Sequence, residues 1–197
     1  MQMRRPWPAR VIFALALLSL TGTARADDIK DAIAEALRAY EVGEYTTAAG
    51  QLDYAAQLVR QLKGGRLEAF LPQPVAGWTG TKAEMAATSM FGGGTSVERA
   101  YTKLDSRITV QIIGDAPMLQ GLMMMFGNPA MLQGNAKLQT IKGQRAIVQI
   151  EPNGTDGELS IAVGQRFLVK ITGNRVSRDD LIAFAQAIDY EGLAKTN

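Results

Sequence analysis

The sequence predicts an α+β fold in which an N-terminal helical hairpin packs with an antiparallel sheet of about six strands that carries helices. Residues 27–70 repeat apolar side chains every three or four positions, and residues 79–197 repeat them every second position. A segment with two prolines, 71–78, separates the two periods. We therefore divide the chain into a leader (1–26), the helical hairpin, a proline-containing linker and an α+β domain.

The first 26 residues have the pattern of a secretory signal peptide. The segment begins with three arginines, Arg4, Arg5 and Arg10. An apolar run follows at 11–20, and Ala24-Arg25-Ala26 has the small-x-small pattern of a cleavage site before Asp27. The run is about half as long as the roughly 20 residues that span a bilayer as a helix. We expect Sec-dependent export to the periplasm or the medium, with no transmembrane span after cleavage.

The composition excludes several kinds of chemistry. The 197 residues include neither cysteine nor histidine, which excludes thiol nucleophiles, disulfides, imidazole bases and metal sites built on these ligands. Four of the 21 basic residues and none of the 19 acidic ones lie in the leader, so the remaining chain carries a net charge of −2. We therefore expect no nucleic-acid partner.

Residues 27–70 are expected to form two helices. The apolar positions of the first helix are Ile29, Ile33, Ala36, Leu37 and Tyr40. Val42-Gly43-Glu44 interrupts the pattern, and the second helix is expected to stop at Gly64-Gly65. Its apolar positions are Ala48, Leu52, Ala55, Leu58, Val59 and Leu62. A short third helical turn is expected to hold Leu67 and Phe70.

Part of this hairpin, at about residues 34–62, is similar to one unit of the tetratricopeptide family. The small, turn, aromatic and packing positions of that family correspond to Ala36, Gly43, Tyr45, Ala48, Leu52 and Ala55. The family's early Trp and terminal Pro are missing, and the chain has no second copy of the unit. The resemblance implies hairpin-type helix packing and, more weakly, a peptide-binding role. A plain helical hairpin is the alternative.

The linker and the strands follow from local signals. Pro72 and Pro74 favour an extended segment, and Trp78 is expected to anchor the joint on the core of the second domain. Six strands are expected, at 97–104, 108–113, 137–141, 144–151, 158–163 and 166–172. Their connectors are short and rich in turn residues, which predicts antiparallel neighbours. Ser177 and Asp180 then form the N-cap and box partner of a final amphipathic helix.

The second half of the chain also resembles an uncharacterised group of exported bacterial proteins, over roughly residues 97–190. Gly127-Asn128-Pro129-Ala130 carries this resemblance, together with Val163-Gly164 and Phe167-Leu168-Val169. In that group an apolar segment that ends near Asn-Pro-Ala lies between pairs of strands. The resemblance implies no particular activity.

The segment 117–132, which we call the Met-rich segment, is the main candidate site. It contains a short helix that is apolar on almost all sides, interrupted at Gly127-Asn128-Pro129. Three interpretations remain open: a core element, since Met fills irregular gaps; an adaptable apolar surface for a partner or lipid chain; and a thioether site for Cu(I). The candidate binding residues are Met118, Leu122, Met123, Met124, Met125, Phe126 and Met131.

Other motifs favour structural roles. The glycine-rich stretch 91–96 lacks the spacing and the lysine of a phosphate loop, which indicates a hairpin loop. Residues 151–158 lack the spacing of a calcium loop and are typical of a turn. The carboxylate pairs Asp27-Asp28 and Asp179-Asp180 lie at expected chain or helix starts.

The sequence therefore predicts an exported, non-catalytic binding or accessory protein of the cell envelope. We expect it to contact a protein partner or an apolar molecule through the Met-rich segment, without a cofactor or metal. One alternative is a structural accessory subunit in which this segment is buried as core. Another is an enzyme of unrecognised class that uses carboxylates.

Overall fold

The computed structural model describes residues 24–87, 92–132 and 134–196. Most of the expected signal peptide, 1–23, and Phe91 of the glycine-rich stretch lie outside the described residues. The chain divides into two compact units, Met1–Ala55 and Ala56–Asn197. The division falls inside the second helix, and each unit is described by itself.

The first unit is a helical hairpin, as expected. It consists of α1 (Ala24–Glu41) and the first half of α2 (Tyr45–Glu68). Gly43 forms the turn with a positive φ of 80°, and the rings of Tyr40 and Tyr45 lie 5.9 Å apart beside it. From Asp27 to Ala55, the part of this unit whose side chains are described, the buried residues are all alanines, namely Ala32, Ala36, Ala39, Ala48 and Ala55.

The expected apolar stripe of α1 is thus buried only in part. Ile33 and Leu37 are 50% and 58% exposed, whereas the buried side chains of α1 are the short ones of Ala32, Ala36 and Ala39. In α2, Leu52 is likewise exposed, whereas Leu58 is buried. Periodicity identified both helices and three of the buried alanines, Ala36, Ala48 and Ala55, but it grouped them with larger side chains that are exposed.

The expected stop of the second helix at Gly64-Gly65 is wrong, because α2 continues to Glu68. Gly64 is buried, and a Cβ at this position would overlap the side chain of Met85. This glycine therefore serves a close approach between α2 and a strand rather than a helix end. Leu67, expected in a separate turn, belongs to α2 and lies in the core of the second unit.

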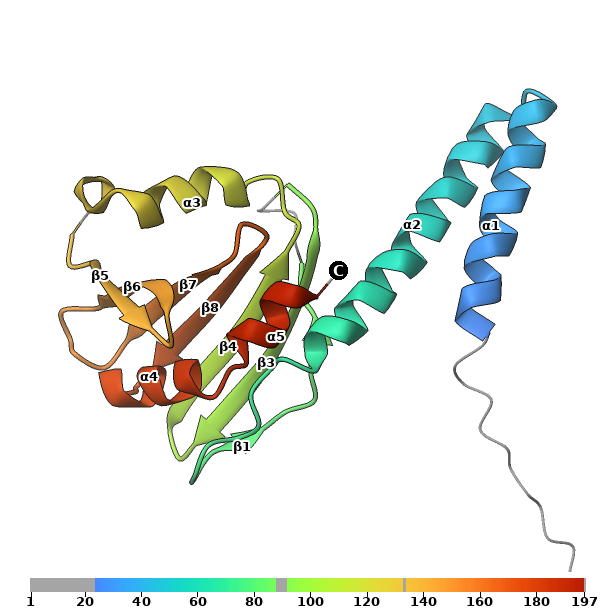
Figure 1. Ribbon diagram of the computed structural model, residues 1–197. Helices are drawn as coiled ribbons and strands as arrows, with labels where there is room; N and C mark the ends of the chain where they lie inside the picture. The colour runs from blue at the N-terminus through green and yellow to red at the C-terminus, as the bar shows by residue number, and fades with distance from the viewer. Residues whose placement is uncertain (1–23, 88–91, 133, 197) are drawn as a thin grey trace, which may run out of the picture. The chain divides into compact units, whose positions relative to one another are not determined.

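The second unit is built on an eight-stranded antiparallel sheet (Figure 1). The strands are β1 (Thr79–Gly80), β2 (Glu84–Met85), β3 (Thr95–Lys103), β4 (Ser106–Gly114), β5 (Lys137–Ile141), β6 (Gln144–Ile150), β7 (Gly157–Val163) and β8 (Phe167–Asn174). Their order is β1-β3-β4-β8-β7-β6-β5, and β2 pairs with β3. The six expected strands are confirmed, and the two-residue strands β1 and β2 are additional.

Helices cover both faces of this sheet (Figure 1). They are α3 (Leu119–Gly127), a 3-10 turn (Pro129–Met131), α4 (Arg178–Gln186) and α5 (Tyr190–Lys195). The expected capping box of Ser177 and Asp180 starts α4. The expected final helix ends at Gln186, and Asp189 caps the separate helix α5 by accepting a hydrogen bond from the Gly192 amide.

The larger core lies between the sheet, α4 and α5. Phe184 of α4 is fully buried, with its ring 4.6 Å from that of Tyr101 on β3. Trp78 meets the same ring edge-on at 5.3 Å, so it anchors the linker on this core as expected. The opposite face carries a smaller core that includes Leu119 and Phe126 of α3. Within the described ranges, the structure contains no helix long and apolar enough to cross a membrane.

Candidate functional site

The helix α3 forms the first part of the Met-rich segment. It lies on the face of the sheet that carries the smaller core. Leu119 and Phe126 are buried against Ile113 of β4 and Leu168 of β8. The guanidinium of Arg145 donates a hydrogen bond of 3.1 Å to the carbonyl of Phe126, near the end of α3. A basic group at this position satisfies a free helix carbonyl and favours the negative end of the helix.

The seven candidate binding residues have different environments. Phe126 is buried, whereas Leu122 and Met123 are half-buried against the smaller core. Met125 is also half-buried and faces a cavity, which Met131 lines as well. Met124, between Met123 and Met125, is 64% exposed. Met118 and Met131 are 56% and 47% exposed. One short helix thus supplies core contacts, a cavity wall and an apolar outer surface.

The cavity is a groove of about 430 Å³ between α3, the chain that follows it and the sheet. This volume is within the range of roughly 300–1,000 Å³ that is usual for small-molecule sites. Its apolar lining consists of Leu122, Met125, Phe126, Met131, Leu132, Ala136, Ile147 and Leu168. Unbranched Met side chains can adapt their shape, so this wall suits a flexible apolar ligand.

The sheet also gives the groove a polar side that sequence reasoning missed. Gln149 of β6 and Glu158 and Ser160 of β7 line it. The Ser160 hydroxyl donates to Glu158 at 3.3 Å, and Lys170 Nζ of β8 lies 2.9 Å from the same carboxylate. Strand alternation places Glu158 and Ser160 on one face, but nothing local indicates that this face is the one beneath α3.

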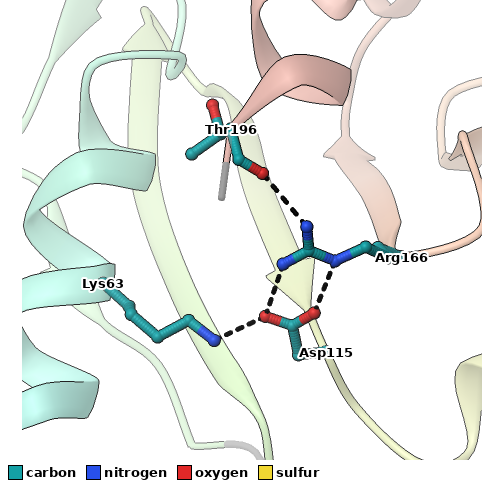
Figure 2. A network of polar contacts seen from close by, with 4 residues as sticks. All are labelled: Lys63, Asp115, Arg166 and Thr196. Carbon is teal, nitrogen blue, oxygen red and sulfur yellow. Dashed lines mark hydrogen bonds and ion pairs between the residues drawn. The ribbon is translucent and has the colours of Figure 1, made fainter.

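A cluster of polar contacts fixes the start of the Met-rich segment (Figure 2). Asp115 directly follows β4, has a positive φ of 54° and precedes Ala116-Pro117. Its carboxylate lies 2.6 Å from Lys63 Nζ and 2.9 Å from Arg166 Nε. Arg166 also donates to the carbonyl of Thr196 at 3.2 Å. The hydrogen bonds and charge of Arg166, with those of Lys63, lower the pKa of Asp115 below its ordinary value despite partial burial.

The remaining motifs have structural contacts. Gly92, Gly93 and Gly94 have positive φ angles and lead into β3, as a hairpin loop requires. The Asp156 carboxylate accepts hydrogen bonds from Asn153, Asn174 and the Arg175 amide, which holds the turn after β6. In the part of the chain that the structure describes, no three carboxylates form a group that could hold a metal ion.

The chain was also compared with known proteins. No family model, no curated protein and no solved structure matches it.

Proposed function

We propose that the protein is an exported, non-catalytic binding protein of the cell envelope that holds an apolar ligand in the groove beneath α3. The groove itself carries this proposal. Leu122, Met125 and Phe126 form its helix side, while Ile147 and Leu168 form part of its floor. A ligand placed between them removes apolar surface from water on two sides at once.

The energetics favour this role. Each square ångström of apolar surface removed from water contributes about 25 cal/mol, so an extended hydrocarbon chain in such a groove gains several kcal/mol before the entropic costs of binding. The charged network at Asp115 holds one end of the Met-rich segment, and the bond from Arg145 to Phe126 holds the end of α3. These anchors keep the helix side of the groove in place.

The experiment uses two adjacent methionines as a matched pair. Met125 lines the groove, whereas Met124 is exposed. Binding of the neutral apolar fluorophore N-phenyl-1-naphthylamine is measured by titration of the mature protein. We expect Met125→Ser to weaken binding about tenfold, since loss of apolar contact of this size costs about 1.4 kcal/mol. Met124→Ser should bind like the parent protein, and unchanged binding in Met125→Ser would contradict the proposal.

A second candidate function is the binding of a protein partner on the outer surface of α3. Met118 and Met124 are more than half exposed, and the sequence has no charged residue between Asp115 and Lys137. Uncharged, methionine-bearing surfaces of this kind are typical of adaptable protein interfaces. If this candidate is right, Met124→Ser weakens capture of the partner from an envelope extract and Met125→Ser does not.

A further inference from the structure

A second hollow continues the groove along the same face of the sheet. It has a volume of about 300 Å³ and lies at the end of β6 and the start of β7. Gln149 and Glu158 are direct neighbours across these two strands, and both line the groove as well as the second hollow. The two spaces therefore meet at this residue pair.

The character of the face changes from apolar to acidic along this path. Leu168 and Ile147 lie at the end covered by α3, whereas Glu158, Glu151 and Asp156 line the other end. Among the described residues that line the two hollows, three are carboxylates and none is Lys or Arg. The combined site thus has a neutral apolar part and a negatively charged part.

The carboxylates of the acidic end have different surroundings. Asp156 accepts a hydrogen bond of 2.9 Å from the Arg175 amide, which holds it in place and lowers its pKa. Lys170 Nζ lies 2.9 Å from the Glu158 carboxylate and offsets its charge. Glu151 is exposed at the rim. A positively charged group on a ligand is therefore attracted mainly by Glu151 and Asp156.

We infer that the ligand is a single-chain amphiphile with a cationic head, whose tail lies in the groove beneath α3 and whose head lies beside Glu151, Asp156 and Glu158. This inference rests on the proposed function, because it needs the groove to hold an apolar chain. The complementary charge selects a cation over a neutral or anionic head. Because the carboxylates are partly exposed to solvent, the preference is moderate and decreases with salt.

The test compares three probes with the same chain and different heads. Dodecyltrimethylammonium, dodecyl maltoside and dodecyl sulfate are titrated into the mature protein by calorimetry, each below its micelle concentration. We expect the cationic probe to bind about fivefold more tightly than the maltoside at low salt, and the sulfate to bind most weakly. At high salt the three affinities should converge.

A substitution at the acidic end distinguishes the contribution of the ligand's head to binding from that of its tail. Glu151→Gln should weaken the preference for the cation and leave binding of the maltoside unchanged, because Glu151 lines only the second hollow. Unchanged binding of the maltoside also shows that the variant is folded. Equal affinities of the parent protein for all three probes, or tightest binding of the sulfate, would overturn the inference while the groove function stands. If none of the probes binds, both the inference and the proposed function are wrong.

Discussion

The guanidinium of Arg166 binds both carboxylate oxygens of Asp115, with Nε 2.9 Å from Oδ1 and Nη2 3.2 Å from Oδ2 (Figure 2). Lys63 of α2 approaches the same carboxylate at 2.6 Å. Three segments distant in sequence, at positions 63, 115 and 166, are thus held at one point, directly before the Met-rich segment. A two-pronged arginine contact has a more defined geometry than an ordinary surface ion pair.

Asp115 contributes both charge and backbone conformation. Asp115→Asn removes the charge but keeps a residue that tolerates a positive φ, so we expect a loss of about 1 kcal/mol in the free energy of unfolding. Asp115→Ala also places alanine in the left-handed region, which should add a further loss of about 1 kcal/mol. Urea denaturation measures both values. Equal stabilities of the two variants would show that the positive φ is not maintained.

The charge of Asp115 also predicts a pH dependence. Its pKa is lower in the folded protein than the value of about 3.9 of an unfolded chain, so its stabilisation is fully present above about pH 5. The stabilisation is lost as the pH falls through the folded-state pKa. The difference in unfolding free energy between the parent protein and Asp115→Asn should therefore be constant from pH 7 to about pH 5 and vanish in stronger acid. A difference that grows in acid would contradict this assignment.

The Met-rich segment predicts unequal costs for neighbouring substitutions. Phe126 is 3% exposed, so Phe126→Ala should lower the unfolding free energy by about 3–5 kcal/mol. Met124 is 64% exposed, and Met124→Ser should change it by about 0.5 kcal/mol or less. Denaturant melts of both variants provide the comparison. A large loss in Met124→Ser would mean that its side chain is covered.

Substitutions of two adjacent glycines, Gly64 and Gly65, test whether α2 continues through them to Glu68. Gly65 has open space where a Cβ would stand, so Gly65→Ala should stabilise the protein by about 1 kcal/mol through helix propensity. At Gly64 the new Cβ would displace Met85, so Gly64→Ala should gain less than Gly65→Ala. Thermal melts can rank the three proteins. If neither substitution raises the melting temperature, α2 ends before Gly64.

The export prediction has a direct readout. The leader pattern predicts cleavage after Ala26, so the exported protein should begin at Asp27. Amino-terminal sequencing of protein recovered from the periplasm or the medium determines this terminus. Replacement of Leu17 and Leu18 by Arg should block export, since it divides the apolar run. A mature protein that retains Met1 would show that the leader is not cleaved.

Much of the fold could be predicted from the sequence because its signals are local. The turn-rich connectors place β3 beside β4 and join β5 to β8 into a meander, and the pattern of Ser177 and Asp180 marks the start of α4. The strands β1 and β2 could not be predicted, because each has only two residues, too few to show a periodicity. Both form by pairing with β3. The glycines at 64 and 65 indicated a helix end, because the close approach of Gly64 to the distant Met85 cannot be seen in the local sequence.

The candidate site, too, could be predicted from the sequence only in part. Composition identified the Met-rich segment, since a run without charge and with clustered methionines is unusual along this chain. The polar side of the groove depends on which strands lie beneath α3. These strands are set by the pairing of β4 with β8, two strands that are far apart in sequence. Gln149, Glu158 and Ser160 therefore enter the site only through the sheet order.

The central claim is that an apolar ligand lies in the groove, between α3 and the sheet. Nuclear magnetic resonance of protein labelled with carbon-13 at the methionine methyl groups tests it most directly, with dodecyl maltoside as the added ligand. Met125 and Met131 line the groove, so their signals should shift, while those of the exposed Met118 and Met124 should stay in place. Shifts confined to Met118 and Met124, or no shifts at all, would contradict the account.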